Sequence, residues 1–214
     1  MKKMEKAAHR LSEKIASNMQ YDNEKKAIIE YGLLAIFNII IIGLVISFAG
    51  ILFDFWYESI IIFIGVGILK KSTGGAHAGT LGRCVVISVL SITLFAAISR
   101  YALGFPIGIY INSGITTTVF IICSMVFYKL VPVDTPNKPI KKPEKIKKLR
   151  RQSFILLVLY TVLTIIATIF APAWDRLYSI AFCIRFALLW QTLMLTTYGH
   201  RIIRRLNKIC CKGG

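Results

Sequence analysis

A histidine and a cysteine, two side chains that can together perform nucleophilic chemistry, share one glycine-rich segment of this sequence. His77 and Cys84 lie in the stretch 70–84, which reads KKSTGGAHAGTLGRC. An imidazole can accept the thiol proton, and the thiolate that results can attack a carbonyl carbon. A single cysteine is also often a small buried hydrophobic residue, so the pair by itself leaves a purely structural role open.

The spacing of His77 and Cys84 restricts the backbone between them. In a straight helix two residues seven positions apart are separated by about 10.5 Å along the axis, whereas proton transfer needs hydrogen-bond contact at about 3 Å. Helical side chains all lean toward the N-terminus, so a change of rotamer does not close this gap. If the pair is catalytic, the segment must bend or break, and we expect Gly79 and Gly82 to be the points of departure.

Neighbouring groups can assist a thiol and an imidazole. We expect the backbone N–H groups of Gly74 and Gly75 to be candidate donors to an oxyanion. The sequence does not rank the candidates for a third group that orients the imidazole, which are Ser72, Thr73, Asp134 and Gln191. The cysteines lack accompanying ligands at metal-site spacing, so we expect neither a metal nor another cofactor.

The composition places these residues in a membrane protein. Of 214 residues, 56% are hydrophobic and only 17% are charged, a balance that a soluble domain of this length cannot bury. The apolar residues form runs of about 20, the length that a helix needs to cross a bilayer. These runs lie at approximately 28–49, 57–69, 84–104, 107–130, 152–171 and 177–199. We therefore predict an all-α polytopic protein with about six transmembrane helices in one domain over 27–214.

The first 26 residues have a different pattern. Met4, Ala8, Leu11, Ile15 and Met19 recur at spacings of three and four, with charged residues between them. This periodicity predicts an amphipathic helix that lies in the membrane interface. The alternative is a frayed N-terminus, since chain ends are often disordered.

The net charge of +17 has two explanations. Clustered Lys and Arg residues can neutralise the phosphates of a nucleic acid, but they are also enriched in the cytoplasmic loops of membrane proteins. Most of the 27 basic residues fall before the first run, between the second and third, after the fourth, and in the tail. Charge placement therefore predicts cytoplasmic termini and a cytoplasmic segment 70–84, and it makes a nucleic-acid partner unnecessary.

Arg185 lies inside the sixth apolar run. A charge within a membrane span is a functional hypothesis by default. Pairing with Asp54 or Glu58, or extension of the side chain to the outer face, are alternative expectations.

The His/Cys segment resembles the accessory gene regulator B (AgrB) family. The resemblance is carried by Gly74-Gly75-Ala76-His77-Ala78, by Arg83-Cys84, and by the loop sequence PVDTPNKP at 132–139. It implies a bacterial cell-membrane endopeptidase that faces the cytoplasm and trims AgrD, a quorum-sensing propeptide. It also implies that Cys84 and His77 are catalytic, and it suggests a homodimer.

The chemistry implied by this resemblance is consistent with a cysteine nucleophile. Cys84 attacks the carbonyl that precedes the propeptide's C-terminal tail, and His77 protonates the departing amine. The Cys84 thioester that results can exchange with a thiol of the bound peptide, which closes a thiolactone, or with a hydroxyl, which closes a lactone. Exchange between two thioesters is nearly isoenergetic, whereas a serine enzyme would start from a more stable oxoester.

The basic cytoplasmic loop 131–151 has two compatible roles. It can determine topology and contact anionic lipids, at about 1 kcal/mol per basic residue, or it can bind the acidic tail that AgrD-like propeptides carry according to the resemblance. Its candidate residues are Lys138, Lys141, Lys142, Lys145, Lys147, Lys148, Arg150 and Arg151.

Two functions of other classes compete with the peptidase. A small transporter or channel for peptides or ions would use Arg185 and His77 in its pathway, but ionisable residues are nearly absent from the apolar runs. A membrane scaffold would recruit an acidic partner without chemistry.

Overall fold

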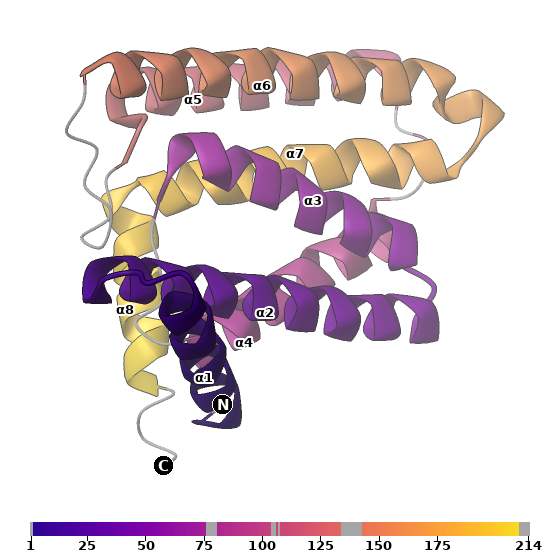
Figure 1. Ribbon diagram of the computed structural model, residues 1–214. Helices are drawn as coiled ribbons and strands as arrows, with labels where there is room; N and C mark the ends of the chain where they lie inside the picture. The colour runs from indigo at the N-terminus through magenta and orange to yellow at the C-terminus, as the bar shows by residue number, and fades with distance from the viewer. Residues whose placement is uncertain (1, 76–80, 104–105, 107, 134–142, 210–214) are drawn as a thin grey trace.

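A computed structural model describes residues 2–75, 81–103, 106, 108–133 and 143–209, and these residues are helical almost throughout (Figure 1). Within them the only β-type pairing is an isolated bridge between Gly74 and Val133. The all-α prediction is therefore confirmed. In chain order the elements are α1 (Lys2–Asn18), α2 (Asn23–Leu52), α3 (Trp56–Thr73), α4 (Leu81–Ala97), the π-helical turn η1 (Ile98–Ala102), α5 (Ile109–Leu130), α6 (Pro143–Phe170), the 3-10 turn η2 (Ala171–Ala173), α7 (Arg176–Leu195) and α8 (Thr197–Ile209).

Five helices in the described part of the chain are long and apolar enough to cross a membrane, namely α2, α4 with η1, α5, α6 with η2, and α7. The chain is thus a multi-pass helical membrane protein. The expected span at 57–69 corresponds to α3, whose 18 residues carry Glu58 in the first turn and Lys70 and Lys71 in the last. A helix of this length extends about 27 Å. Six crossings remain a prediction, because the 18 residues of α3 include three charged side chains.

Helix α7 is the centre of the bundle. Of its membrane-span residues 61% are buried, against 28% or less in each of the other four spans. It packs most extensively against α3 and α6, and it also contacts α5 and α4 (Figure 1). Helix α7 is therefore enclosed by the other helices, which expose apolar side chains on their outer faces. This arrangement suits a bundle surrounded by lipid.

The N-terminal helix forms as predicted, and it packs through a neighbouring face that shares Ala8 with the predicted apolar positions. Ala8, Ser12 and Ala16, spaced by one helical turn, are at most 5% exposed where α1 contacts α2. Leu11 and Met19 are 41% and 59% exposed. Small side chains allow two helices to approach closely, so the larger apolar residues point away from the bundle.

Two helix boundaries differ from the prediction. The segment 131–151, expected to be a loop, is helical from Pro143 onward, because proline suits the first position of a helix and lysines continue it readily. The run 177–199 is divided at Thr196, whose side-chain oxygen accepts a hydrogen bond from the N–H of Gly199 (3.3 Å). This cap begins α8, a helix that the sequence analysis did not predict.

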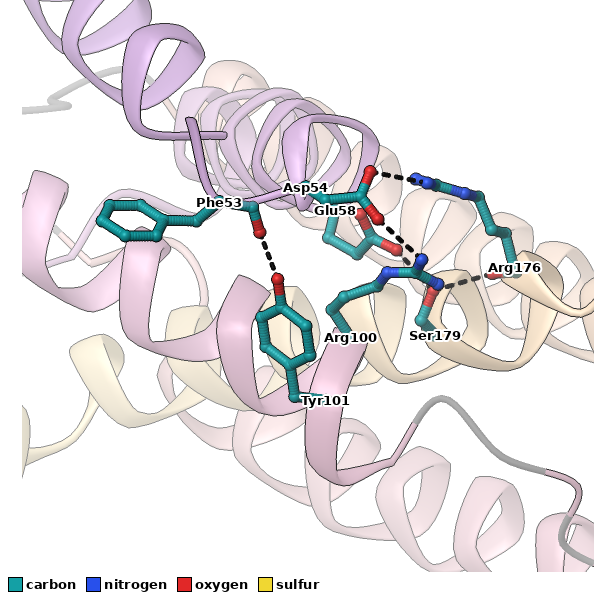
Figure 2. A network of polar contacts seen from close by, with 7 residues as sticks. All are labelled: Phe53, Asp54, Glu58, Arg100, Tyr101, Arg176 and Ser179. Carbon is teal, nitrogen blue, oxygen red and sulfur yellow. Dashed lines mark hydrogen bonds and ion pairs between the residues drawn. The ribbon is translucent and has the colours of Figure 1, made fainter. Parts of the chain in front are cut away.

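A polar network joins three elements at one end of the bundle (Figure 2). Asp54, in the turn between α2 and α3, accepts hydrogen bonds from Arg100 of η1 and Arg176 of α7, each at 2.8 Å. Beside it, the Ser179 hydroxyl donates to the buried Glu58 carboxylate at 2.6 Å. The structure thus brings Asp54, Glu58 and the start of α7 together at this end of the bundle.

Arg185 pairs with neither carboxylate. It is 2% exposed, and it donates to the side-chain oxygens of Asn112 (3.0 Å) and Thr116 (2.8 Å) on α5. Its guanidinium lies 4.7 Å from the ring centroid of Phe182. The expected ion pair is therefore wrong, as is extension to the surface, because neutral oxygens and an aromatic face enclose the charge.

The Asp54 network predicts a pH-dependent contribution to stability. The hydrogen bonds from Arg176 and Arg100 hold the pKa of Asp54 below its usual value of 3.8. A carboxylate with a lowered folded-state pKa stabilises the fold above its unfolded pKa and loses this contribution as the pH falls through the folded value. Asp54→Asn should therefore lower the melting temperature at neutral pH by a few degrees at most, since exposed ion pairs contribute little.

The measurement is the melting temperature of both proteins in detergent between neutral pH and about pH 3. We expect the difference between wild type and variant to shrink below about pH 4. Asparagine suits this position because Asp54 has a left-handed backbone (φ 50°), which Asn also tolerates. A difference that stays constant over this range would contradict a charged role for Asp54.

Candidate active site around Cys84

Cys84 differs from the other two cysteines that the structure describes. It lies in the first turn of α4 and is half-buried, whereas Cys123 and Cys183 are fully buried in the bundle. A thiol must be accessible to act as a nucleophile, so Cys84 is the candidate that the structure favours among these three.

The Cys84 side chain lines a small cavity at the end of the bundle opposite the Asp54 network. Four helices contribute to its wall, and most of the lining residues are apolar. Lys70, Ser88 and Gln191 add an ammonium group, a hydroxyl and an amide. The complete lining consists of Val66 and Lys70 of α3, Cys84, Ile87 and Ser88 of α4, Trp190, Gln191 and Met194 of α7, and Ile203 of α8. The cavity therefore places Cys84 among mostly apolar neighbours with three polar ones.

The glycine-rich segment begins where α3 ends. Gly74 has φ 75°, and its N–H donates to the carbonyl of Lys70 at 3.1 Å. A Cβ atom at Gly74 would lie 2.2 Å from the carbonyl oxygen of Val133, so both the backbone angle and the close approach require glycine. The N–H of Val133 in turn donates to the carbonyl of Thr73 at 2.9 Å. The hydrogen bond from the Gly74 N–H to the carbonyl of Lys70 caps the end of α3.

Gln191 holds this helix end from the other side. Its Nε2 donates to the side-chain oxygen of Thr73 and to the carbonyl of Gly74, each at 2.7 Å. The hydroxyls of Thr73 and Ser72 donate to the carbonyl of Leu69, at 2.9 and 3.1 Å. Three of the four candidate orienting residues are thus engaged with the end of α3.

Several predicted site residues lie outside the described residues, namely His77, Asp134, Lys138, Lys141 and Lys142. The geometry between His77 and Cys84 stays a prediction for this reason. The expected break at Gly82 is wrong, because Gly82 and Cys84 both belong to α4. Any departure from helix between the pair must precede Leu81.

The remaining basic candidates occupy the first three turns of α6. Lys145, Lys147, Lys148 and Arg151 are exposed. Arg150 is half-buried, donates to the carbonyl of Tyr128 and lies 4.9 Å from that ring's centroid. Arg150 therefore joins α6 to α5, while the other four present their charge to the surroundings.

Sequence reasoning missed the contributions of Val133 and of α8. No local signal predicts that Val133 pairs with Gly74, since the two are far apart in the chain. The position of α8 was detectable, because Thr196 is a good N-cap residue and the tail alternates basic and apolar residues at helical spacing.

The fold and the site define a class of protein, a multi-pass helical membrane protein with a half-buried thiol in a cavity at one end of its bundle. The family model of accessory gene regulator B, AgrB, matches residues 8–195. The chain belongs to the AgrB family, whose members take part in the processing of AgrD.

Named relatives match nearly the full length. An AgrB-like protein of Clostridium perfringens (strain SM101 / Type A) is 28% identical over 94% of this chain and 95% of its own length. A second one, from strain 13 of the same species, is 26% identical over the same shares. An AgrB-like protein of Clostridium acetobutylicum is 24% identical over 96% of this chain and 91% of its own. No solved structure matches the chain significantly.

The burial of the cysteines predicts their order of reactivity. In a Cys210→Ser, Cys211→Ser background, a membrane-permeant maleimide should modify Cys84 at least about tenfold faster than Cys123 or Cys183, because alkylation needs an accessible thiol. Mass spectrometry of the folded protein, with Cys84→Ala as control, measures the three sites. Equal rates at Cys84 and the two buried thiols would contradict this assignment.

Proposed function

We propose that this protein is a membrane-embedded cysteine endopeptidase, which removes the C-terminal tail of an AgrD-type propeptide through a thioester on Cys84. The observation that carries the proposal is the Cys84 thiol in a cavity whose wall includes Gln191, the residue that also holds the glycine-rich segment at Gly74. The AgrB family membership supplies the class of substrate.

His77 is the proposed acid and base. It follows the anchored Gly75 by two residues, and two residues of chain span at most about 7 Å. Gly75 lies against Gln191, which lines the same cavity as Cys84, and this proximity supports the proposed role of His77.

The proposed reaction proceeds by two acyl transfers. His77 accepts the proton of Cys84, the thiolate adds to the scissile carbonyl, and the protonated imidazole then gives its proton to the departing amine of the tail. A thiol or hydroxyl of the bound peptide next attacks the thioester, which closes the ring and returns the proton and the Cys84 thiol. The apolar residues around the cavity limit attack by water on the thioester.

The exposed basic residues of α6 are the proposed binding surface for acidic partners. Lys145, Lys147, Lys148 and Arg151 are exposed and form no ion pair with the carboxylates of the described residues. Their positive charge attracts the acidic tail of a propeptide as well as anionic lipid head groups. By resemblance to the family, we also propose a homodimer with this end of the bundle at the cytoplasmic face of the cell membrane.

Removal of the nucleophile or of the base tests the peptidase directly. Cys84→Ala and His77→Ala should each lower propeptide cleavage at least about a thousandfold, since the two act as one unit. The assay is co-expression or co-reconstitution with an AgrD-type peptide, with mass spectrometry of the tail and of a thioester adduct on Cys84. Cys123→Ala, which alters a buried thiol elsewhere, is the matched control and should cleave normally. Unimpaired cleavage by both Cys84→Ala and His77→Ala would refute the proposal.

Reversal of charge on α6 tests the binding surface. Lys145→Glu with Lys148→Glu should raise KM roughly three- to tenfold with little change in kcat, because long-range charge acts on encounter and binding. Replacing both residues by arginine keeps the charge and is the control. The proposal also requires that added salt raise KM for the wild type more than for the double variant. Identical KM values at low salt would exclude this surface as a substrate contact.

A further inference from the structure

We propose that Gln191 is a positioning residue, which fixes the start of the glycine-rich segment beside the Cys84 thiol and so sets the geometry in which thiol and imidazole meet. The inference rests on the proposed peptidase function and assigns to Gln191 a role that the motif itself does not contain. Gln191 lies on α7, more than a hundred residues from the segment that it holds.

The hydrogen bonds of Gln191 define its orientation. The carbonyl oxygen of Gly74 can only accept, so the group that faces it at 2.7 Å is the amide nitrogen. The second proton of the same nitrogen is directed at the side-chain oxygen of Thr73, also at 2.7 Å. Both donor positions are used, and Gln191 is 1% exposed. Its amide nitrogen therefore holds backbone and is not available to orient an imidazole.

The next residue is confined by α7 as well. A Cβ atom at Gly75 would lie 3.3 Å from the carbonyl oxygen of Met194 and 3.4 Å from Nε2 of Gln191. The backbone of Gly75 thus lies directly against α7, with φ 123°. On its other side the segment is paired with Val133. The backbone at Gly74 and Gly75 therefore lies between Val133 and α7, and Gln191 supplies the side-chain contact.

One side chain therefore touches both parts of the site. Gln191 lines the cavity that contains Cys84, and it also bonds the helix end from which the chain continues to His77. A displacement of about 1 Å between reacting groups can cost about a hundredfold in rate. Loss of the amide should consequently affect the chemical step more than the binding of substrate.

The test compares two buried neighbours on α7. Gln191→Met keeps the length of the side chain but removes its donors, whereas Thr192→Val removes a hydroxyl that donates to Cys123 at 3.1 Å, away from the cavity. With an AgrD-type peptide as substrate, Gln191→Met should lower kcat about 10- to 100-fold with KM within about threefold of the wild type. Thr192→Val should retain wild-type kcat. Thr73→Val, which removes one of the two acceptors, should fall between them.

Hydrogen exchange provides a readout that does not depend on cleavage. Amides of residues 72–75 should exchange faster in Gln191→Met than in the wild type or in Thr192→Val. A wild-type kcat in Gln191→Met, or equal losses of kcat in Gln191→Met and Thr192→Val, would overturn the inference.

The two proposals fail in different ways. If the wild type cleaves no peptide, or if Cys84→Ala cleaves normally, the proposed function fails and the positioning role in catalysis fails with it. The exchange measurement then still decides whether Gln191 anchors the segment. Unchanged exchange in Gln191→Met would refute the anchor itself.

Discussion

The interior of a bilayer offers no hydrogen-bonding partners, so a polar group that this bundle buries is costly unless the protein supplies its partner. Most buried hydroxyls donate a hydrogen bond to a carbonyl of their own helix. Thr116 and Thr164 donate to carbonyls one turn earlier, at 2.9 and 2.8 Å. Polar groups that instead reach another helix, such as Tyr160 with the carbonyl of Gly65 at 2.9 Å, fix how two helices are aligned.

The alignment of α3 with α7 follows from this constraint. At one end of this parallel pair Ser179 donates to Glu58, and at the other Gln191 donates to Thr73 and Gly74. The two contacts are separated by about 22 Å along α3 and about 18 Å along α7. The helix that leads into the glycine-rich segment is therefore held at both ends by the most buried helix, which makes the position of the segment a property of the whole bundle.

Local sequence signals predicted the helices and the candidate nucleophile, because run length and residue type are local properties. They did not predict where Pro143 starts α6 or that Gly82 is helical, since capping and tertiary packing decide such boundaries. They also misassigned the partner of Arg185, whose neighbours belong to α5. Which polar residues meet across helices depends on helix rotation and register, and a single sequence does not contain these directly.

Helix α8 completes the wall of the cavity that contains Cys84. It turns away from α7 and runs across the end of the bundle (Figure 1). This turn is tight, since a Cβ atom at Gly199 would lie 2.2 Å from the carbonyl oxygen of Leu193. The close approach brings Ile203, which is 7% exposed, to the cavity that contains Cys84. Under the proposed mechanism, an apolar side chain from α8 at this position would limit the access of water to a thioester on Cys84.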